Sequence, residues 1–511
     1  MNILIIKKIL LPVILSLFAL SANAQTKTYN VDVGVIGGGA GGITATLVAA
    51  ENGLSVVLLE KMAFLGGGGN HFEGTYASES PMQIEENNPY SPEVAFKQIM
   101  NFHHWRIDPK LLRTFINATG DNIRYMMAHG VEFEKIQTMQ PKNANRTWHV
   151  LKNNTGATMI NAFVRDIKKY PDATILTKTS GKKLIQDDTG RITGVIAEDD
   201  AGNEIIINAK AVIVATGGFA MNKEMVLKYL RFPLEGQGAA GRVGDGVNMM
   251  MDVGADTVNM DLGAQAGPCF DVDGSYTFGH GAKYLAIGAL VLQPFLHVDM
   301  TGDRFFDESQ PLEFMSNAIE ARGGRTWHII NQNVLDELQY GKGLAKNHGN
   351  MLVRGAKLDN LQAILEQAMA EPGPVVVKAN TLDELAVATG MDPQILAASL
   401  VRNNKYAQQG YDEEFYKDRI YLRSMETGPY YAVKTIIKMF ATLGGARINE
   451  KFQVLDKKHQ IIPGLYAIGQ DAGGLYSDSY DMSIAEGTAS AFAITGGRLA
   501  PLAIIAQDLK K

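Results

Sequence analysis

Cysteine is nearly absent from this sequence: Cys269 is the only one in 511 residues. A single thiol cannot form an intrachain disulfide, a thiolate metal cluster or the cysteine pair that attaches a c-type haem. The adjacent residues His103, His104 and Trp105 have no carboxylate or cysteine partners at a metal-ligand spacing. We therefore expect no metal site.

An excess of positive charge is also absent, because 48 Lys and Arg residues are outnumbered by 54 Asp and Glu residues. The formal net charge of -6 provides no basic surface for a phosphate backbone, so no nucleic-acid partner is expected. The 46% hydrophobic and 20% charged residues are ordinary for a globular chain, whose length suits two or three domains. A small-molecule substrate is the expected partner.

Near the N-terminus, a short apolar run extends from Ile9 to Leu20. It follows Lys7 and Lys8 and precedes the small residues of 21–24, which is typical of a secretory signal peptide spanning 1–24. The run is shorter than the roughly 20 residues that span a bilayer, although an uncleaved anchor is the alternative. We expect an exported, periplasmic protein with no membrane span after cleavage.

A glycine-rich turn follows the first strand-like segment of the mature chain. Gly37, Gly39 and Gly42 fit the G-x-G-x-x-G pattern, which lets a backbone approach a pyrophosphate at a helix N-terminus. Glu60 ends the next strand, where a carboxylate can bind ribose hydroxyls and disfavours a 2'-phosphate. The flanking elements are expected at 32–36, 43–52 and 56–60. Any tight βα turn can use glycine, but the combination predicts dinucleotide binding.

Four consecutive glycines come directly after the second strand. Gly66 to Gly69 and then Asn70 would place backbone without side chains against the flavin half of FAD. The alternative is a flexible surface loop. Within this segment, Gly68, Gly69 and Asn70 are candidate cofactor-binding residues, and FAD is the predicted cofactor.

The remaining patterns predict an α/β fold with one interruption. Buried strands at 211–216 and 464–469 each run into glycine, and alternating stretches from 173 to 207 predict a β-meander. Helices are expected at 92–106, 109–130, 312–322, 359–370, 381–389 and 393–408. The nucleotide domain is therefore expected at 30–261 and 429–509, with a separate domain at 262–428.

Several motifs in order make the chain resemble the flavoprotein family of fumarate reductase and succinate dehydrogenase, which includes 3-ketosteroid 1-dehydrogenase and urocanate reductase. The motifs are Val35 to Gly42, Leu65 to Asn70, Ala215 to Phe219, Gly244 to Gly246, Thr301 to Phe305, Pro429 to Val433, Thr442 to Gly445 and Ile462 to Gly474. The resemblance implies a Rossmann-like FAD-binding domain interrupted by a capping domain that covers the flavin.

The resemblance also implies roles for individual residues. Glu60 would bind the adenosine ribose, Asn70 would lie beside the flavin and Asp245 near the adenosine half. Gly469 and Asp471 would lie at the ribityl and pyrophosphate, and Gly487 and Thr488 would open a helix towards the flavin C2 carbonyl. The further cofactor-binding candidates in these motifs are Thr216 and Gly217. His71 is one residue out of register with the histidine that holds FAD covalently in some members, so noncovalent FAD is expected.

Four positions that bind dicarboxylates in this family differ here. Gly267 and Phe440 stand where the family has histidine, and Leu312 stands where it has the proton-donating arginine. The final substrate arginine corresponds to Tyr480, or to Ile484 if the loop insertion is placed elsewhere. A dicarboxylate would lose charge-assisted hydrogen bonds of about 1.5–3 kcal/mol each. A neutral or partly aromatic substrate is expected instead.

The loop from Leu475 to Ser483 is about four residues longer than the family's arginine loop, and it suggests replacements. Tyr480 is the first catalytic candidate, as a proton donor or as a group that polarises a substrate carbonyl. Asp478 in the same loop and Tyr431 are further candidates. The alternatives are that the loop residues only cap the helix and that Tyr431 is a packed core aromatic.

Together these features predict an FAD-dependent oxidoreductase. It would transfer hydride between flavin N5 and a carbon–carbon bond next to an activating carbonyl, as an exported reductase with a separate electron donor protein. A steroid-like 1,2-dehydrogenase that passes electrons to a quinone is one alternative. A catalytically silent FAD-binding subunit is the other.

Overall fold

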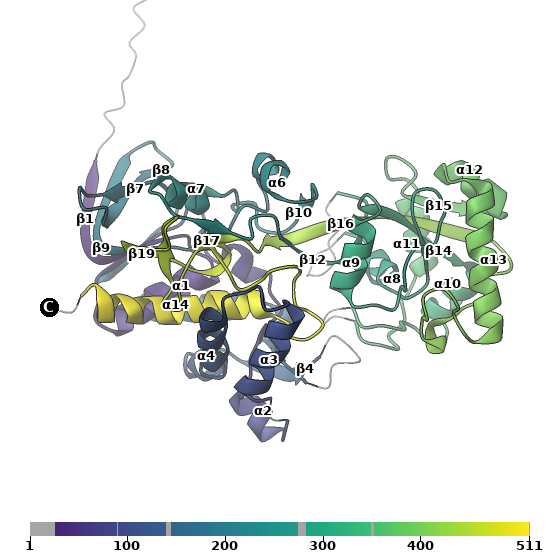
Figure 1. The fold of residues 1–511 in the computed structure, drawn as a ribbon, viewed down its shortest axis with the longest axis horizontal. Helices are drawn as coiled ribbons and strands as arrows, with labels where there is room; N and C mark the ends of the chain where they lie inside the picture. The colour runs from purple at the N-terminus through teal and green to yellow at the C-terminus, as the bar shows by residue number, and fades with distance from the viewer. Residues whose placement is uncertain (1–25, 89, 139–144, 274–282, 349–351, 510–511) are drawn as a thin grey trace, which may run out of the picture.

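A computed structural model describes residues 26–88, 90–138, 145–273, 283–348 and 352–509. The predicted signal peptide at 1–24 lies outside the described residues. Figure 1 shows two bodies side by side, with the long C-terminal helix α14 running through one of them and the helices α10 to α13 gathered in the other. The chain crosses between the bodies more than once.

The first body is built on an eight-stranded sheet in which β18, β19, β9, β1, β2 and β6 are neighbours in that order and β7 and β8 extend from β9. Strands β1, β2, β6, β9 and β19 are parallel, as a βαβ fold requires. The strands are β1 (Lys27–Ile36), β2 (Val56–Leu59), β6 (Ala173–Leu176), β7 (Thr179–Gln186), β8 (Ile192–Asp199), β9 (Glu204–Val214), β18 (Gln453–Leu455) and β19 (Ile461–Ala467).

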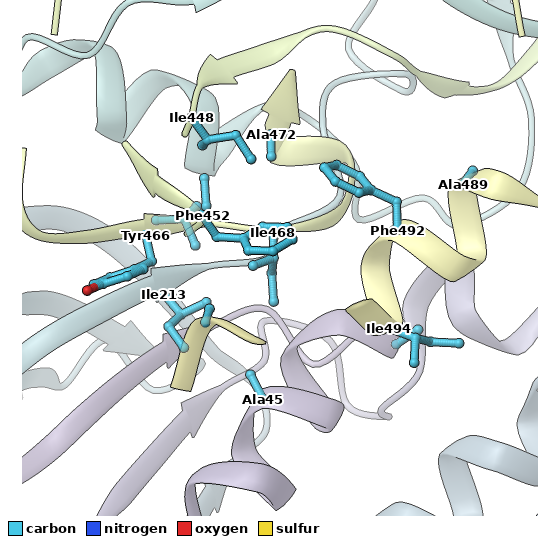
Figure 2. Close-up of a cluster of buried hydrophobic side chains, with 14 of the residues drawn as sticks. Ala45, Ile213, Ile448, Phe452, Tyr466, Ile468, Ala472, Ala489, Phe492 and Ile494 are labelled. Carbon is cyan, nitrogen blue, oxygen red and sulfur yellow. The ribbon is translucent and has the colours of Figure 1, made fainter. Parts of the chain in front are cut away.

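Two apolar helices pack against each other beside this sheet. The helices are α1 (Ala40–Glu51) and α14 (Thr488–Gln507). Glycine makes their close approach possible, since a Cβ at Gly497 would lie 2.6 Å from the carbonyl oxygen of Gly41. Among the described residues, α14 alone is long and apolar enough to match a membrane span, but most of it is buried in the protein. Figure 2 shows Phe492 and Ile494 of α14, which belong to the same hydrophobic core cluster as Phe452, Tyr466 and Ile468.

Smaller elements surround this body. Pro92 and Pro109 occupy the first turns of their helices, and the side chains of Ser91 and Asp108 cap those helices. The helices are α2 (Pro81–Glu85), α3 (Pro92–Phe102), α4 (Pro109–Ala128), α5 (Ala157–Ile167), α6 (Lys223–Tyr229) and α7 (Asp245–Asp252). Two three-stranded sheets complete it: β3 (Gly74–Tyr76), β5 (Trp148–Leu151) and β4 (Phe133–Gln137), then β11 (Thr257–Val258), β17 (Gly445–Arg447) and β20 (Ala472–Gly473).

The second body is the cap, which has its own six-stranded sheet and hydrophobic core. The strands are β10 (Glu235–Gly236), β12 (Gly263–Phe270), β13 (Leu296–Val298), β14 (Arg325–Asn331), β15 (Val376–Ala379) and β16 (Tyr430–Thr442). The helices are α8 (Leu285–Val291), α9 (Leu312–Glu320), α10 (Gln332–Gln339), α11 (Leu361–Ala368), α12 (Leu382–Thr389) and α13 (Pro393–Gln409). The α/β fold with an inserted cap is therefore confirmed.

The long strand β16 connects the two bodies (Figure 1). Its first half pairs with β14 and β15 in the cap, and its second half pairs with β12 and β10. All of these partners belong to the six-stranded sheet, so the whole of β16, including the part nearest the first body, is paired within that sheet. Sequence pattern does not show this, because a buried strand has the same apolar character in either domain.

Candidate active site

The turn between β1 and α1 contains glycines that the fold itself requires. Gly37 has a φ of +106°, and a Cβ there would overlap the carbonyl oxygen of Ala215. A Cβ at Gly42 would overlap the carbonyl oxygen of Gly37. Neither position tolerates a side chain. These two glycines bring the ends of β1, β9 and α1 close together.

At two other glycines, the packing of the protein itself would leave room for a side chain. At Gly39 an added Cβ would meet only the carbonyl oxygen of Gly66, at 3.8 Å, and at Gly68 it would meet nothing within 4 Å. Neither residue has a left-handed φ. No side chain caps α1, whose N-cap is Gly39. This arrangement of open space beside free helix-terminal N–H groups fits a pyrophosphate.

Glu60 closes one edge of the turn. Its carboxylate is buried and accepts hydrogen bonds from the backbone N–H groups of Gly38, at 2.8 Å, and Met62, at 2.7 Å. The next residue, Lys61, forms a 2.6 Å ion pair with Asp245, the first residue of α7. Both predicted adenosine-binding carboxylates therefore lie at the same end of the sheet, and their ribose contacts remain predictions.

Asp471 joins the ends of β9 and β19. Its buried carboxylate accepts hydrogen bonds from the backbone N–H groups of Thr216, Gly217 and Gly218 and from the Thr216 hydroxyl. Burial raises the pKa of Asp471, although these hydrogen bonds act in the opposite direction. Gly469, which has a φ of +61°, begins the short turn that carries Asp471. Four of the predicted cofactor residues are thus brought together.

The second glycine loop lies against the first. Gly39 and Gly66 form a parallel bridge, and the side-chain amide of Asn70 donates to the Leu65 carbonyl at 2.9 Å. A Cβ at Gly69 would lie 3.0 Å from the backbone nitrogen of Ala40. The loop is therefore a packed part of the turn rather than a flexible surface segment.

Arg242 is a buried cation that has no local signal in the sequence. Its guanidinium donates to the backbone carbonyls of Ala239, Gln237 and Phe440, and no carboxylate partner is found among the described residues. A Cβ at Gly217 would lie 3.0 Å from its Cγ. Burial lowers the pKa of Arg242 to about 10, so the group keeps its charge at neutral pH. This positive charge lies beside the segment that holds Asp471.

The N-terminus of α14 carries the predicted Gly487 and Thr488. Gly487 has a φ of +85°, and a Cβ there would lie 2.9 Å from the backbone nitrogen of Tyr76. The backbone N–H of Ala489 donates to the hydroxyl oxygen of Tyr480 at 3.3 Å. Tyr480 is therefore at the helix end expected to face the flavin.

Aromatic rings enclose Tyr480. Its ring centroid lies 5.2 Å from that of Phe440 and 5.7 Å from that of Tyr476. Burial, and then the nearby carboxylate of Asp481, raise the pKa of Tyr480 above its ordinary value of 10. The hydroxyl stays protonated at neutral pH, caps α14 and remains able to donate its own proton.

Asp481 anchors a chain of hydroxyl groups behind Tyr480. The Thr488 hydroxyl donates to its carboxylate at 2.5 Å, and the Tyr476 hydroxyl donates to Thr488 at 3.1 Å. The Nε2 atom of His103 lies 3.9 Å from the other carboxylate oxygen. Asp481 and His103 are both buried, so the contacts that fix this loop lie in the protein interior.

Glu313 reaches this loop from the cap. It lies on the first turn of α9, and its Oε1 accepts a hydrogen bond from the Ser483 backbone N–H at 2.7 Å. The side chain is fully buried, and Oε2 has no hydrogen-bond partner. Burial raises the pKa of Glu313 to about 7. In the sequence, the only feature that points to Glu313 is its position next to Leu312, which the resemblance aligns with the family's arginine.

Apolar groups fill the neighbouring positions. Gly267 has a φ of +85°, and a Cβ there would lie 2.7 Å from Leu292 and 3.2 Å from Leu312. Its backbone N–H donates to the Ser316 hydroxyl of α9 at 2.9 Å. A histidine does not fit at Gly267 in this packing. The contact between β12 and α9 therefore requires glycine at this position.

The structure places the catalytic candidate Tyr431 in the core of the cap, as the packed-aromatic alternative expects. Tyr431 is fully buried in the cap core, on the part of β16 that pairs with β14 and β15, and its hydroxyl donates to Gln332 at 2.9 Å. A catalytic role for Tyr431 stays a prediction.

Asp478, another catalytic candidate, forms ion pairs with two basic residues of the first body. Its carboxylate pairs at the surface with His104, at 2.8 Å, and Arg106, at 3.4 Å. Burial acts to raise the pKa of Asp478, but hydrogen bonds from His104 and Ser477 hold it below its ordinary value. These contacts fit the alternative that Asp478 orders the loop, and a catalytic role for it stays a prediction. The described residues contain no group that could hold a metal ion.

The fold and the glycine turns define an FAD-dependent flavoprotein with an inserted cap. A family model described as an FAD binding domain matches residues 32–483, and the chain belongs to this family. It is similar to the vinyl phenol reductase of Lactiplantibacillus plantarum, with 31% identity over 473 residues that cover 91% of this chain and 94% of the relative. The protein is an FAD-dependent oxidoreductase of CH–CH groups.

The chain is also similar to a second curated relative and to a solved structure. The fumarate reductase (cytochrome) of Shewanella frigidimarina is 28% identical over 490 residues, which cover 94% of this chain and 78% of the relative. A solved 3-ketosteroid delta1-dehydrogenase from Sterolibacterium denitrificans superposes with a TM-score of 0.72 at 20% identity, covering 93% of this chain and 99% of that one. The latter similarity shows the fold alone.

Proposed function

We propose that the protein is a reductase of a carbon–carbon double bond in a neutral, partly aromatic substrate. The double bond is conjugated either with a carbonyl, as the sequence suggests, or with a phenol ring, as in the substrate named for the vinyl phenol reductase. The observation that carries this proposal is the packing of Gly267 against Leu292 and Leu312, which leaves no room for a dicarboxylate-binding histidine.

Different side chains of the protein bind the substrate and support the cofactor in this proposal. Bound FAD, when reduced, supplies hydride from N5. Tyr480, enclosed by Phe440 and Tyr476, offers an aromatic wall and a hydroxyl that can hydrogen-bond the polar end of a conjugated substrate. The Asp471 carboxylate and the glycine turns hold the segments around the cofactor, which we propose is noncovalently bound.

Electrons reach the site from outside this chain in our proposal. The sequence has no cysteine pair for a c-type haem, and the described residues form only the FAD-binding domain and the cap. A separate donor protein or a quinone would therefore reduce the flavin. The signal-like sequence at 1–24 supports export to the periplasm.

The same site can serve the reverse reaction, so a steroid-like dehydrogenase that reduces a quinone is the alternative within this class. A catalytically silent FAD-binding subunit is the alternative outside it, because four family substrate residues are replaced. One experiment separates these functions. Bound FAD is photoreduced without oxygen and then mixed with vinyl phenols, enones or fumarate, while oxidised enzyme is mixed with a saturated 3-ketosteroid.

We expect vinyl phenols or enones to reoxidise the reduced flavin, and fumarate to leave it reduced. Bleaching of the oxidised enzyme by the ketosteroid would favour the dehydrogenase. Failure of every compound to change the flavin absorbance would favour the silent subunit. Rapid reoxidation by fumarate would contradict the argument from Gly267.

A further inference from the structure

The carboxyl group of Glu313 lies where the cap meets the loop from Leu475 to Ser483. Helix α9, which carries it, is on the side of the cap next to the FAD-binding domain (Figure 1). Leu312 and Met315 of the same helix belong to the core cluster of that domain. The Ser483 backbone N–H binds only one of the two carboxyl oxygens of Glu313. The other oxygen is buried and available.

The charges around Glu313 explain why it holds a proton. Asp481 faces it from the loop, and its carboxylate adds to the effect of burial on the pKa of Glu313. Behind Asp481 lie the buried ring of His103 and the hydroxyls of Tyr476 and Thr488. On α9 itself, Glu320 lies at the far end of the helix and accepts from Gln265 at 2.8 Å. No cation contacts Glu313 in the described part of the chain.

The other acids near the loop are less suitable proton donors. A general acid works best when its pKa is near the working pH. Burial moves the pKa of Tyr480 further above 10, whereas it brings the pKa of Glu313 to about 7. Asp478 is paired at the surface, and both oxygens of Asp481 face other side chains. Glu313 alone combines burial with a free oxygen and a suitable acidity in this group.

We propose that Glu313 is the general acid of the reduction, which takes the place of the arginine lost at Leu312. This inference rests on the proposed reductase function. One alkene carbon gains hydride with its electron pair from reduced flavin, and the π electrons move to the neighbouring carbon. That carbon takes the proton from Oε2 of Glu313, which becomes a carboxylate. A solvent proton then restores the acid, and Tyr480 orients the substrate.

The test uses the FAD-loaded enzyme with Glu313→Gln, because glutamine keeps the hydrogen bond from Ser483 but has no acidic proton. Reduced enzyme is mixed with the alkene that reoxidises wild type fastest, and separately with ferricyanide, which takes electrons without a substrate proton. We expect the alkene reaction to slow by about 10²- to 10⁴-fold while the ferricyanide reaction is unchanged. Glu320→Gln, on the same helix, should leave both reactions unchanged.

The pH profile provides a second readout. The wild-type alkene reaction should be constant at low pH and fall as pH rises through about 7, where Glu313 loses its proton. The slow reaction of Glu313→Gln should lack this step, and Glu313→Asp should restore part of the rate. Wild-type rate and pH profile in Glu313→Gln would overturn the proposal, as would equal losses with the alkene and ferricyanide. Failure of wild type with all alkenes would instead reject the reductase function.

Discussion

The hydroxyl oxygen of Tyr480 accepts a hydrogen bond from the backbone N–H of Ala489 at 3.3 Å, on the first turn of α14. This contact places a phenol at the helix end that the family resemblance directs towards the flavin. Removing the hydroxyl affects both the helix terminus and any substrate that the phenol binds. The two effects are separable because cofactor binding and turnover are measured independently.

Tyr480→Phe should slow alkene reduction by roughly 10- to 100-fold, since a hydrogen bond to a reacting group contributes about 1.5–3 kcal/mol. FAD should remain bound, because the ring still packs on Phe440 and Tyr476. Single-turnover reoxidation of the reduced flavin measures the step. Tyr411→Phe, at an exposed cap tyrosine, is the control. An unchanged rate in Tyr480→Phe removes this hydroxyl from the reaction.

Gly39→Ala should weaken FAD binding without destabilising the apoprotein. The added methyl meets no protein atom closer than 3.8 Å, so it occupies the space that we assign to the pyrophosphate. We expect the dissociation constant of FAD to rise at least tenfold and the unfolding free energy of apoprotein to change by less than about 1 kcal/mol. Flavin fluorescence and urea unfolding measure these quantities. Full affinity in the variant would argue against phosphate at this turn.

Gly267→Ala should destabilise the contact between β12 and α9. A left-handed backbone with a Cβ costs about 1–2 kcal/mol, and overpacking against Leu292 and Leu312 adds about 1–3 kcal/mol. Gly373→Ala isolates the first effect, because Gly373 has a φ of +81° and nothing lies within 4 Å of its Cβ. Equal unfolding free energies for the two variants would show that the packing at Gly267 is loose.

Glu313 should make the stability of the protein depend on pH. Burial raises its pKa from 4.5 to about 7, so between these values the folded state binds more protons than the unfolded state. Stability therefore falls as pH rises through this window, by roughly 3 kcal/mol at about 1.4 kcal/mol per pKa unit. Glu313→Gln should gain stability relative to wild type from pH 5 to pH 8. The unfolding free energies of both proteins are measured at pH 5 and pH 8. The same difference between Glu313→Gln and wild type at both pH values would contradict this prediction.

The cofactor half of the site could be predicted because its signals are local. Gly37 to Gly42 and Glu60 lie in one βαβ unit, where strand, turn and helix patterns support each other. Asp471 was found through its motif, and the structure joins it to Thr216, 255 residues away. Short-range pattern and motif order were enough to select these residues, and their contacts with FAD stay predictions.

The substrate half was predicted less well because its contacts are long-range. Glu313 meets Ser483 over 170 residues, and Arg242 meets Phe440 over 198. No spacing in the sequence indicates that these groups are buried, and burial is what changes the pKa of Glu313. Tyr431 lies in the cap core because it is on the part of β16 that pairs with β14 and β15. The register in which β16 pairs with β14 determines where Tyr431 lies, and the sequence pattern does not reveal that register.

The most direct test of the central claim is turnover with reduced methyl viologen as the electron donor and equal concentrations of para-vinylphenol and fumarate. A reductase of neutral conjugated double bonds should convert the vinylphenol to the saturated ethylphenol, with one hydrogen from flavin and one from solvent, and leave fumarate unreacted. Formation of succinate at a comparable rate, or no consumption of vinylphenol or of enones in its place, would contradict the account.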